Sequence, residues 1–333
     1  RSRDDLDNVR WAFELSLECG ALTDAVDIAI GLSTLWRNAT SYAEGRRWVA
    51  DLEQRTLAPG DRLWVEILGA DIGLGAGDPT AMRSHADAAA DLVDKAEDGG
   101  GAVIAGIYHA IVHLGDIVRA AERLAEVAGA AQDIGEDGLA RLARGYRLVV
   151  LQLGGVSGDV RAEAHELTDG QSTRDYALYL CRWAASLTAL VDRDGPWLDA
   201  LMAAQRDDLA ASGLHENWLT MYWGALMSIV TGRDHVHELA RARARASAEG
   251  RGADADCVLA LAYAAACRDD WEGAAELVGA TEGALLHDTA GYFHQAIVRD
   301  RLVRPRLAPD TYAECVARGR RLALHQIVSD HGL

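Results

Sequence analysis

The chain has 333 residues, of which half are apolar and a quarter are charged, and this composition excludes a disordered chain, a collagen-like fibre and a membrane protein. Asp and Glu outnumber Lys and Arg by 51 to 33, which gives a formal net charge of −18. Affinity for nucleic acid comes chiefly from Lys and Arg replacing the counterions of phosphates, so we expect no direct nucleic-acid binding by this chain.

The five cysteines are an odd number, lie far apart and stand mostly among Ala and Leu, as small buried residues do. A reducing cytoplasm is therefore the expected location. The apolar runs are shorter than the ~20 residues that a membrane span needs, and no signal peptide opens the chain, so we expect no membrane partner. The first residue is Arg1 rather than Met, which predicts a piece of a longer protein.

Apolar residues recur at spacings of three and four from the start of the chain, as in Leu6, Val9, Phe13 and Leu17. The chain has only five prolines, and no stretch alternates with period two for long enough to indicate a strand. Ala has the highest helix propensity and is abundant. The sequence therefore predicts an all-α fold with about 16 helices.

The predicted helices are separated by Gly or Asp followed closely by another Asp or by Pro. These turns lie at Gly77-Asp78-Pro79, Gly115-Asp116, Gly158-Asp159, Asp194-Gly195-Pro196, Gly232-Arg233-Asp234 and Asp269-Asp270-Trp271. Gly is expected to end one helix in the left-handed conformation, and Asp to cap the next. Successive turns are 37 to 43 residues apart, which is one helical hairpin per step. The pattern predicts a superhelical array of degenerate tetratricopeptide-like hairpins.

This periodicity divides the chain into three expected regions. Residues 1–60 form an N-terminal helical segment, residues 61–286 form the repeats, and residues 287–333 form capping helices. The longest step contains the Gly-rich loop at 154–158, so we expect an interruption of the array near residue 155.

In a superhelix of hairpins the first helices line the concave groove. Aromatic, Arg and His side chains supply most of the binding energy in such a site, which would take a partner peptide or a small polar ligand. The competing interpretation is that large side chains at helical spacing belong to the core. The register of the punctuating residues places seven candidates in the groove: Trp64, Asp71, His109, His113, Arg182, Tyr222 and Tyr263.

His109 and His113 are four residues apart on one predicted helix and could share a metal, with Asp116 as a third ligand. The residue after His109 is Ala110, so the Glu of the hydrolase pattern His-Glu-x-x-His is missing. No other local signature of a nucleophile or a paired acid can be assigned. We therefore predict no metal, no cofactor and no catalytic residue.

Segments near both ends resemble a family of large actinobacterial regulators, the signal-transduction ATPases of the LuxR, antibiotic-regulator and cyclase-linked types. At the N-terminal end they are 6–12 (LDNVRWA), 34–36 (TLW) and 44–48 (EGRRW), and near the C-terminal end 271–280 (WEGAAELVGA) and 317–324 (ARGRRLAL). Val316 stands where that family often has Trp. The resemblance implies a helical sensor region that follows a nucleotide-binding module and controls effector domains. No phosphate-binding loop occurs here, since Lys95 is followed by Ala96.

The leading hypothesis is a non-catalytic regulatory module that binds a partner protein segment, a peptide or a small ligand and controls effector domains of a larger transcriptional or signalling regulator. The partner could be another domain of the parent chain. The alternative is a scaffold for homo-oligomerisation, with a homodimer as its product. A third hypothesis, a metal-dependent enzyme, rests on His109 and His113 alone.

Overall fold

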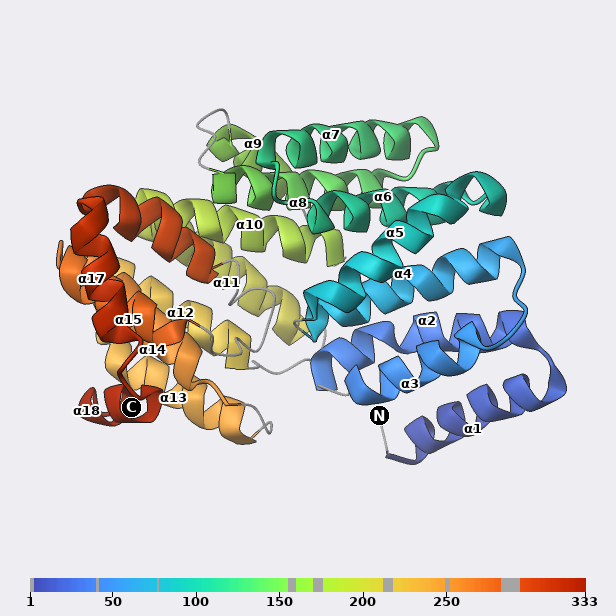
Figure 1. Cartoon of the computed structure of the whole chain (residues 1–333), viewed down its shortest axis with the longest axis horizontal. Helices are drawn as coiled ribbons and strands as arrows, with labels where there is room; N and C mark the ends of the chain where they lie inside the picture. The colour runs from blue at the N-terminus through green and yellow to red at the C-terminus, as the bar shows by residue number, and fades with distance from the viewer. Residues whose placement is uncertain are drawn as a thin grey trace. The chain divides into compact units, whose positions relative to one another are not determined.

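The computed structural model describes residues 3–39, 42–76, 78–154, 160–169, 176–211, 218–248, 252–282 and 294–333 (Figure 1). These residues form seventeen α-helices, a π-helical segment and a 3-10 turn, and no strand occurs among them. The predicted all-α class is confirmed, and the number of helices is close to the expected one.

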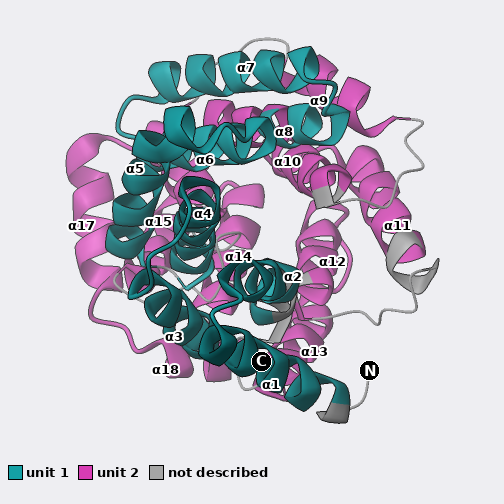
Figure 2. Ribbon diagram, turned by 90° about the vertical axis from the view of Figure 1, so that its right-hand side faces the viewer, with its two compact units in different colours: residues 1–143 teal, residues 144–333 magenta. Residues whose placement is uncertain are grey.

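The chain divides into two compact units, residues 1–143 (unit 1) and residues 144–333 (unit 2), which Figure 2 shows in different colours. The division falls within helix α8 (Asp137–Gly154). The interruption expected near residue 155 and the boundary expected at 286 lie outside the described residues. The boundary expected at residue 60 stays a prediction.

Unit 1 contains seven helices before α8. They are α1 (Arg3–Cys19), α2 (Leu22–Ala39), α3 (Tyr42–Glu53), α4 (Pro59–Gly75), α5 (Pro79–Ala96), α6 (Gly99–Val112) and α7 (Ile117–Asp133). Each helix from α1 to α6 packs against the helix that follows it in the chain. In addition α2 contacts α4, and α4 contacts α6.

Aromatic side chains form the centre of the unit 1 core. Phe13 of α1 stacks on Trp48 of α3 with ring centroids 3.7 Å apart and an interplanar angle of 3°. Trp36 of α2 meets Trp48 edge-on at 5.3 Å. All three are almost fully buried and pack with Val65, Leu68 and Ile72 of α4. Trp36 and Trp48, both from the N-terminal segments that resemble the regulator family, therefore hold three helices together.

Unit 2 holds the remaining elements. They are α9 (Val160–Thr168), α10 (Tyr176–Asp192), α11 (Gly195–Ala211), α12 (Trp218–Val230), α13 (His235–Ala248), α14 (Asp254–Cys267), α15 (Trp271–Thr281), the π-helical η1 (Ile297–Val303), the 3-10 turn η2 (Arg304–Arg306), α17 (Pro309–Gly319) and α18 (Leu324–Asp330). Every residue from 255 to 266 of α14 is buried, so this helix is the centre of the unit. As in unit 1, alternate helices meet, since α12 contacts both α10 and α14.

The turns follow the expected capping pattern with one correction. The carboxylates of Asp78, Asp116 and Asp270 accept hydrogen bonds from backbone N–H groups in the first turns of α5, α7 and α15. Of the punctuating glycines that are described, however, only Gly232 takes a positive φ, at 68°. Before α11 it is Arg193, with φ of 55°, that adopts the left-handed conformation. The Asp cap thus marks the start of α5, α7 and α15, and glycine is not required to end the helix before each of them.

None of the helices in the described ranges combines the length and the apolarity needed to cross a lipid bilayer.

Candidate functional site

The seven candidate groove residues do not share one open surface. In unit 1, Asp71 is buried, and its Oδ1 accepts a hydrogen bond of 2.5 Å from the hydroxyl of Tyr108. Trp64 is half-buried, and its Nε1 donates to Oδ2 of Asp98 at 2.8 Å. The other oxygen of Asp98 caps α6 through the N–H of Gly101. Trp64 and Asp71 therefore tie α4 to α6.

The three candidates of unit 2 are also internal. Arg182, Tyr222 and Tyr263 expose 7%, 2% and 1% of their surface. The hydroxyl of Tyr263 donates to the carbonyl of Leu190 at 2.7 Å, which joins α14 to the end of α10. The expectation that Asp71, Arg182, Tyr222 and Tyr263 line an open groove does not fit this burial. Their helical spacing is that of core residues, which was the competing interpretation.

Tyr222 belongs to a buried polar group around His294. Its hydroxyl lies 3.1 Å from the backbone oxygen of Asp256 and 2.9 Å from Nδ1 of His294. The hydroxyl has one proton, so we assign its donation to the carbonyl, and Nδ1–H of His294 then donates to the hydroxyl. Burial lowers the pKa of His294 to about 3, which keeps the ring neutral. This group joins α12, α14 and the segment before η1 in the interior.

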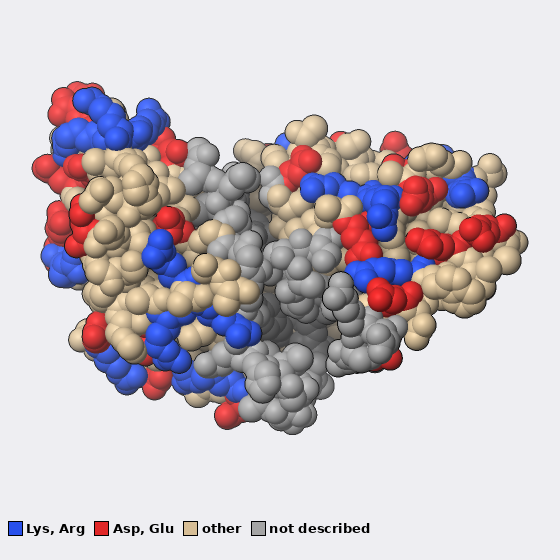
Figure 3. Space-filling model, turned by 90° about the horizontal axis from the view of Figure 1, so that it is seen from below, with Lys and Arg blue, Asp and Glu red and all other residues tan. Residues whose placement is uncertain are grey.

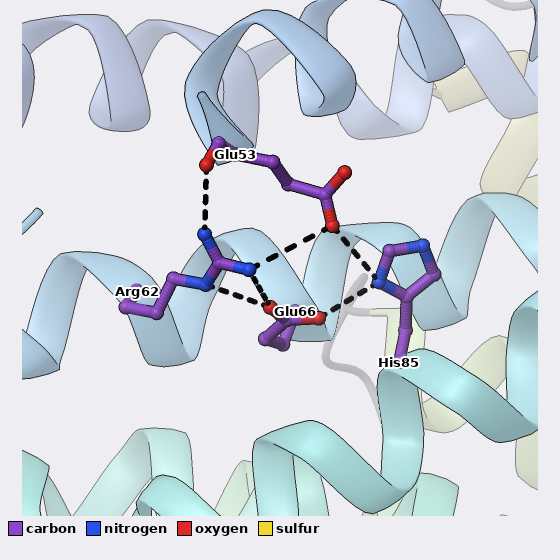
Figure 4. Close-up of polar contacts among 4 residues, drawn as sticks. All are labelled: Glu53, Arg62, Glu66 and His85. Atoms are coloured by element: carbon purple, nitrogen blue, oxygen red, sulfur yellow. Dashed lines mark hydrogen bonds and ion pairs between the residues drawn. The ribbon is translucent and has the colours of Figure 1, made fainter. Parts of the chain in front are cut away.

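Unit 1 contains a partly buried charge cluster that we call the Glu66 cluster, formed by Glu53, Arg62, Glu66 and His85 (Figure 4). The Glu66 side chain of α4 is 4% exposed, and its two oxygens accept from Nε of Arg62 at 2.7 Å and from Nδ1 of His85 at 2.8 Å. Glu53 of α3 completes the cluster, since its backbone oxygen accepts from Arg62 and its carboxylate lies 3.8 Å from Nδ1 of His85.

The charges of the Glu66 cluster are balanced from within. Although burial opposes ionisation, hydrogen bonding from His85 and the charge of Arg62 hold the pKa of Glu66 below its usual range. The hydrogen bond to Glu66 in turn raises the pKa of His85. The ligand atoms of Glu53, Glu66 and His85 are close enough together to hold a metal ion. The Arg62 guanidinium already supplies the compensating cation, however, so the cluster serves to connect α3, α4 and α5.

A second cluster of possible ligand atoms lies at the exposed side of α5 and α6. His113 Nε2 and His109 Nε2 lie 3.4 Å and 3.8 Å from Oδ1 of Asp87, and the two imidazole rings are 4.6 Å apart. Partial burial and the neighbouring His113 lower the pKa of His109. Asp87 also lines an open hollow of about 510 Å³ along α5, together with Pro79, Thr80, Arg83 and Ser84.

The partner of the two histidines differs from the one expected from the sequence. Asp116 caps α7 by accepting from the N–H of Arg119 at 3.1 Å, so its carboxylate has a structural role. Asp87 lies 22 residues before His109 and reaches it only because α5 and α6 pack side by side. Spacing within one helix could not reveal this residue.

An exposed apolar stripe on α1, formed by Trp11 and Leu15, is the clearest surface feature that sequence reasoning missed. Their exposed fractions are 64% and 39%, although Trp36 and Trp48 are 1% and 2% exposed. Cys19 lies one turn further along the same side of the helix and is also exposed. Beside the stripe, Arg10 binds Asp7 at 2.8 Å and Glu44 at 2.6 Å. Trp11 and Leu15 thus form an exposed apolar area that the charged side chains of Arg10 and Asp7 border.

Charged side chains of both signs share the surface. On the face drawn in Figure 3, acidic and basic residues lie next to one another in the right-hand part, while basic residues predominate at the lower left. Exposed examples in unit 1 are the pairs of Arg10 with Asp7 and of Arg123 with Glu126.

Comparison with protein-family models, with curated proteins and with solved structures gave no match. The resemblance of the terminal segments to the actinobacterial regulators therefore stays an expectation from the sequence.

Proposed function

We propose that the chain is a non-catalytic protein-binding module, built from stacked tetratricopeptide-like hairpins, and that Trp11 and Leu15 are the centre of its docking face. The exposure of Trp11 is the observation that carries the proposal. The protein buries its other described large aromatic side chains wholly or in large part but leaves this indole 64% exposed. Tryptophan is the residue type most enriched among energetically dominant interface positions.

The position of the stripe within unit 1 supports the same conclusion. Helix α1 packs on α2 through Phe13 and its neighbours, while Trp11 and Leu15 point away from that core. An apolar outer face of this kind fits a partner that covers it with apolar side chains of its own.

The area involved sets the expected energy. A tryptophan side chain can bury up to roughly 250 Å², so the exposed 64% corresponds to about 160 Å². At roughly 25 cal/mol per Å², covering it contributes about 4 kcal/mol before the costs of association. Truncation of a central interface residue of this kind costs at least about 2 kcal/mol, which is about 30-fold in Kd.

The wider role that we propose is the one implied by the resemblance. The module would serve as the sensor region of a larger transcriptional or signalling regulator, and occupancy of the α1 face would control effector domains. We also propose a cytoplasmic setting, because all five cysteines are free thiols.

The test uses a photo-cross-linking amino acid at position 15 and, as a control, at position 134, where Ile134 is 50% exposed on another part of unit 1. The protein that cross-links only from position 15 is then purified and titrated against the wild type, Trp11→Ala and Val118→Ala. Val118 is a matched control because it is 58% exposed on α7.

We expect Trp11→Ala to weaken binding about 30-fold or more and Val118→Ala to leave Kd unchanged, with equal Tm for all three chains. Equal Kd values for the wild type and Trp11→Ala would overturn the proposal. If position 15 cross-links to a second copy of the chain, sedimentation of the same variants decides whether the docking face serves homodimerisation, the alternative function.

A further inference from the structure

The cluster of Asp87, His109 and His113 combines ligands from two helices of unit 1. His109 and His113 are one turn apart at the end of α6, and Asp87 projects from the middle of α5. The three ligand atoms, Nε2 of both histidines and one carboxylate oxygen, all lie within 4.8 Å of one another. Imidazole and carboxylate are ligands that zinc accepts in proteins.

The separations can be compared with those of a tetrahedral zinc site. Zn–N and Zn–O bonds of roughly 2.0 to 2.2 Å place neighbouring ligand atoms roughly 3.3 to 3.6 Å apart. The observed separations from Oδ1 of Asp87 are 3.4 Å to His113 and 3.8 Å to His109. Small rotations of side chains that are 37% to 49% exposed would close the difference.

The charge around the cluster also distinguishes it from the Glu66 cluster. There, Arg62 binds the carboxylates directly and takes the place of a metal ion. Within the described residues, the basic side chains that lie within 4.0 Å of the Asp87 carboxylate are the two histidines, and no Arg or Lys binds it. A divalent cation would satisfy this carboxylate and both imidazoles at once.

We propose that Asp87, His109 and His113 form a binding site for a divalent transition metal, with Zn²⁺ as the preferred ion. Three protein ligands leave one position of a tetrahedron open, and the three side chains are 37% to 49% exposed. The two nitrogen ligands favour Zn²⁺ over Mg²⁺ and Ca²⁺, which prefer sites made of oxygen alone. The site lies on other helices than the α1 docking face and goes beyond the proposed function.

The experiment measures Zn²⁺ binding to the metal-stripped full chain by calorimetry, with Co²⁺ absorption as a report of coordination geometry. The test variants are Asp87→Asn and His113→Ala. The control is the double variant His235→Ala and His237→Ala, which removes the other closely spaced histidine pair, located on α13 of unit 2. Thermal unfolding without metal checks that each variant is folded.

We expect the wild type and the α13 control to bind one Zn²⁺ at this site and to give the visible spectrum of tetrahedral Co²⁺. Each test variant should lose at least about tenfold in affinity and lose that spectrum, because loss of even an outer-shell partner costs that much. Equal Zn²⁺ affinity in the wild type and His113→Ala, or an octahedral Co²⁺ spectrum in the wild type, would overturn the proposal. Trp11→Ala should leave Zn²⁺ affinity unchanged, so failure of either proposal can be recognised separately.

Discussion

The Glu66 cluster provides a quantitative prediction for Glu66→Gln. This substitution keeps the shape of the side chain but removes the charge that binds Arg62 and His85. Removal of one partner from a buried ion pair costs about 3 to 5 kcal/mol. Since Arg62 and His85 are 32% and 20% exposed and Glu53 remains beside them, we expect a cost near the lower end, about 3 kcal/mol.

The cost should depend on pH. The pKa of Glu66 is lowered in the folded state, so its contribution is complete above 4.5 and is lost as pH falls through the folded value. The pKa of His85 is raised, so its contribution is complete below 6.5 and is lost as pH rises through the folded value. The difference between wild type and Glu66→Gln is therefore largest between pH 4.5 and 6.5.

Urea unfolding of both chains at several pH values measures this difference. Between pH 4.5 and 6.5, thermal unfolding should show a Tm of unit 1 that is lower by roughly 6 to 12 °C in Glu66→Gln. This is the shift expected for about 3 kcal/mol in a unit of this size. His85→Gln is the matched control. It should remove the change in unfolding free energy above pH 6.5 and retain the change below pH 4.5. A cost for Glu66→Gln below about 1 kcal/mol, or one that is constant with pH, would refute the reasoning.

Two substitutions test the packing. Trp48→Ala removes the ring on which Phe13 stacks, and in a fully buried site this should lower the free energy of unfolding by about 3 to 5 kcal/mol in urea titrations; a cost near zero would mean that this stack does not hold α1 to α3. Gly319→Ala would drive a Cβ into the backbone oxygen of Glu276 where α17 crosses α15. We expect a loss of at least about 1 kcal/mol, against no loss for Gly129→Ala, whose Cβ would meet open space; equal stability of the two would contradict the close crossing.

The sequence predicted helices and their starts well because these depend on local chemistry. Asp78 and Asp116 act as caps through hydrogen bonds within a single turn, and such contacts need no knowledge of the tertiary fold. The close packing of α15 on α17 also depends on a glycine, because a Cβ at Gly279 would meet the backbone of Val316.

The site residues were harder to predict because helical periodicity does not tell which side of a helix meets a neighbour. Tyr222 and Tyr263 have the spacing of groove residues but lie in the core, where their hydroxyls bind backbone oxygens. Asp87 meets His113 through the pairing of two helices, which depends on the rotation of each helix about its axis. Trp11 and Trp48 both lie in segments that carry the resemblance, yet only the structure separates the exposed Trp11 from the buried Trp48.

Alkylation of Cys19 is the most direct test of the proposal that α1 is the docking face. Cys19 is exposed on the same side of α1 as Trp11 and Leu15, and the half-buried Cys267 in α14 serves as an internal reference. The alkylation rate of each thiol is measured by mass spectrometry with and without saturating partner. We predict that the partner slows modification of Cys19 and leaves Cys267 unchanged; an unchanged rate at Cys19 under saturation would contradict docking on α1.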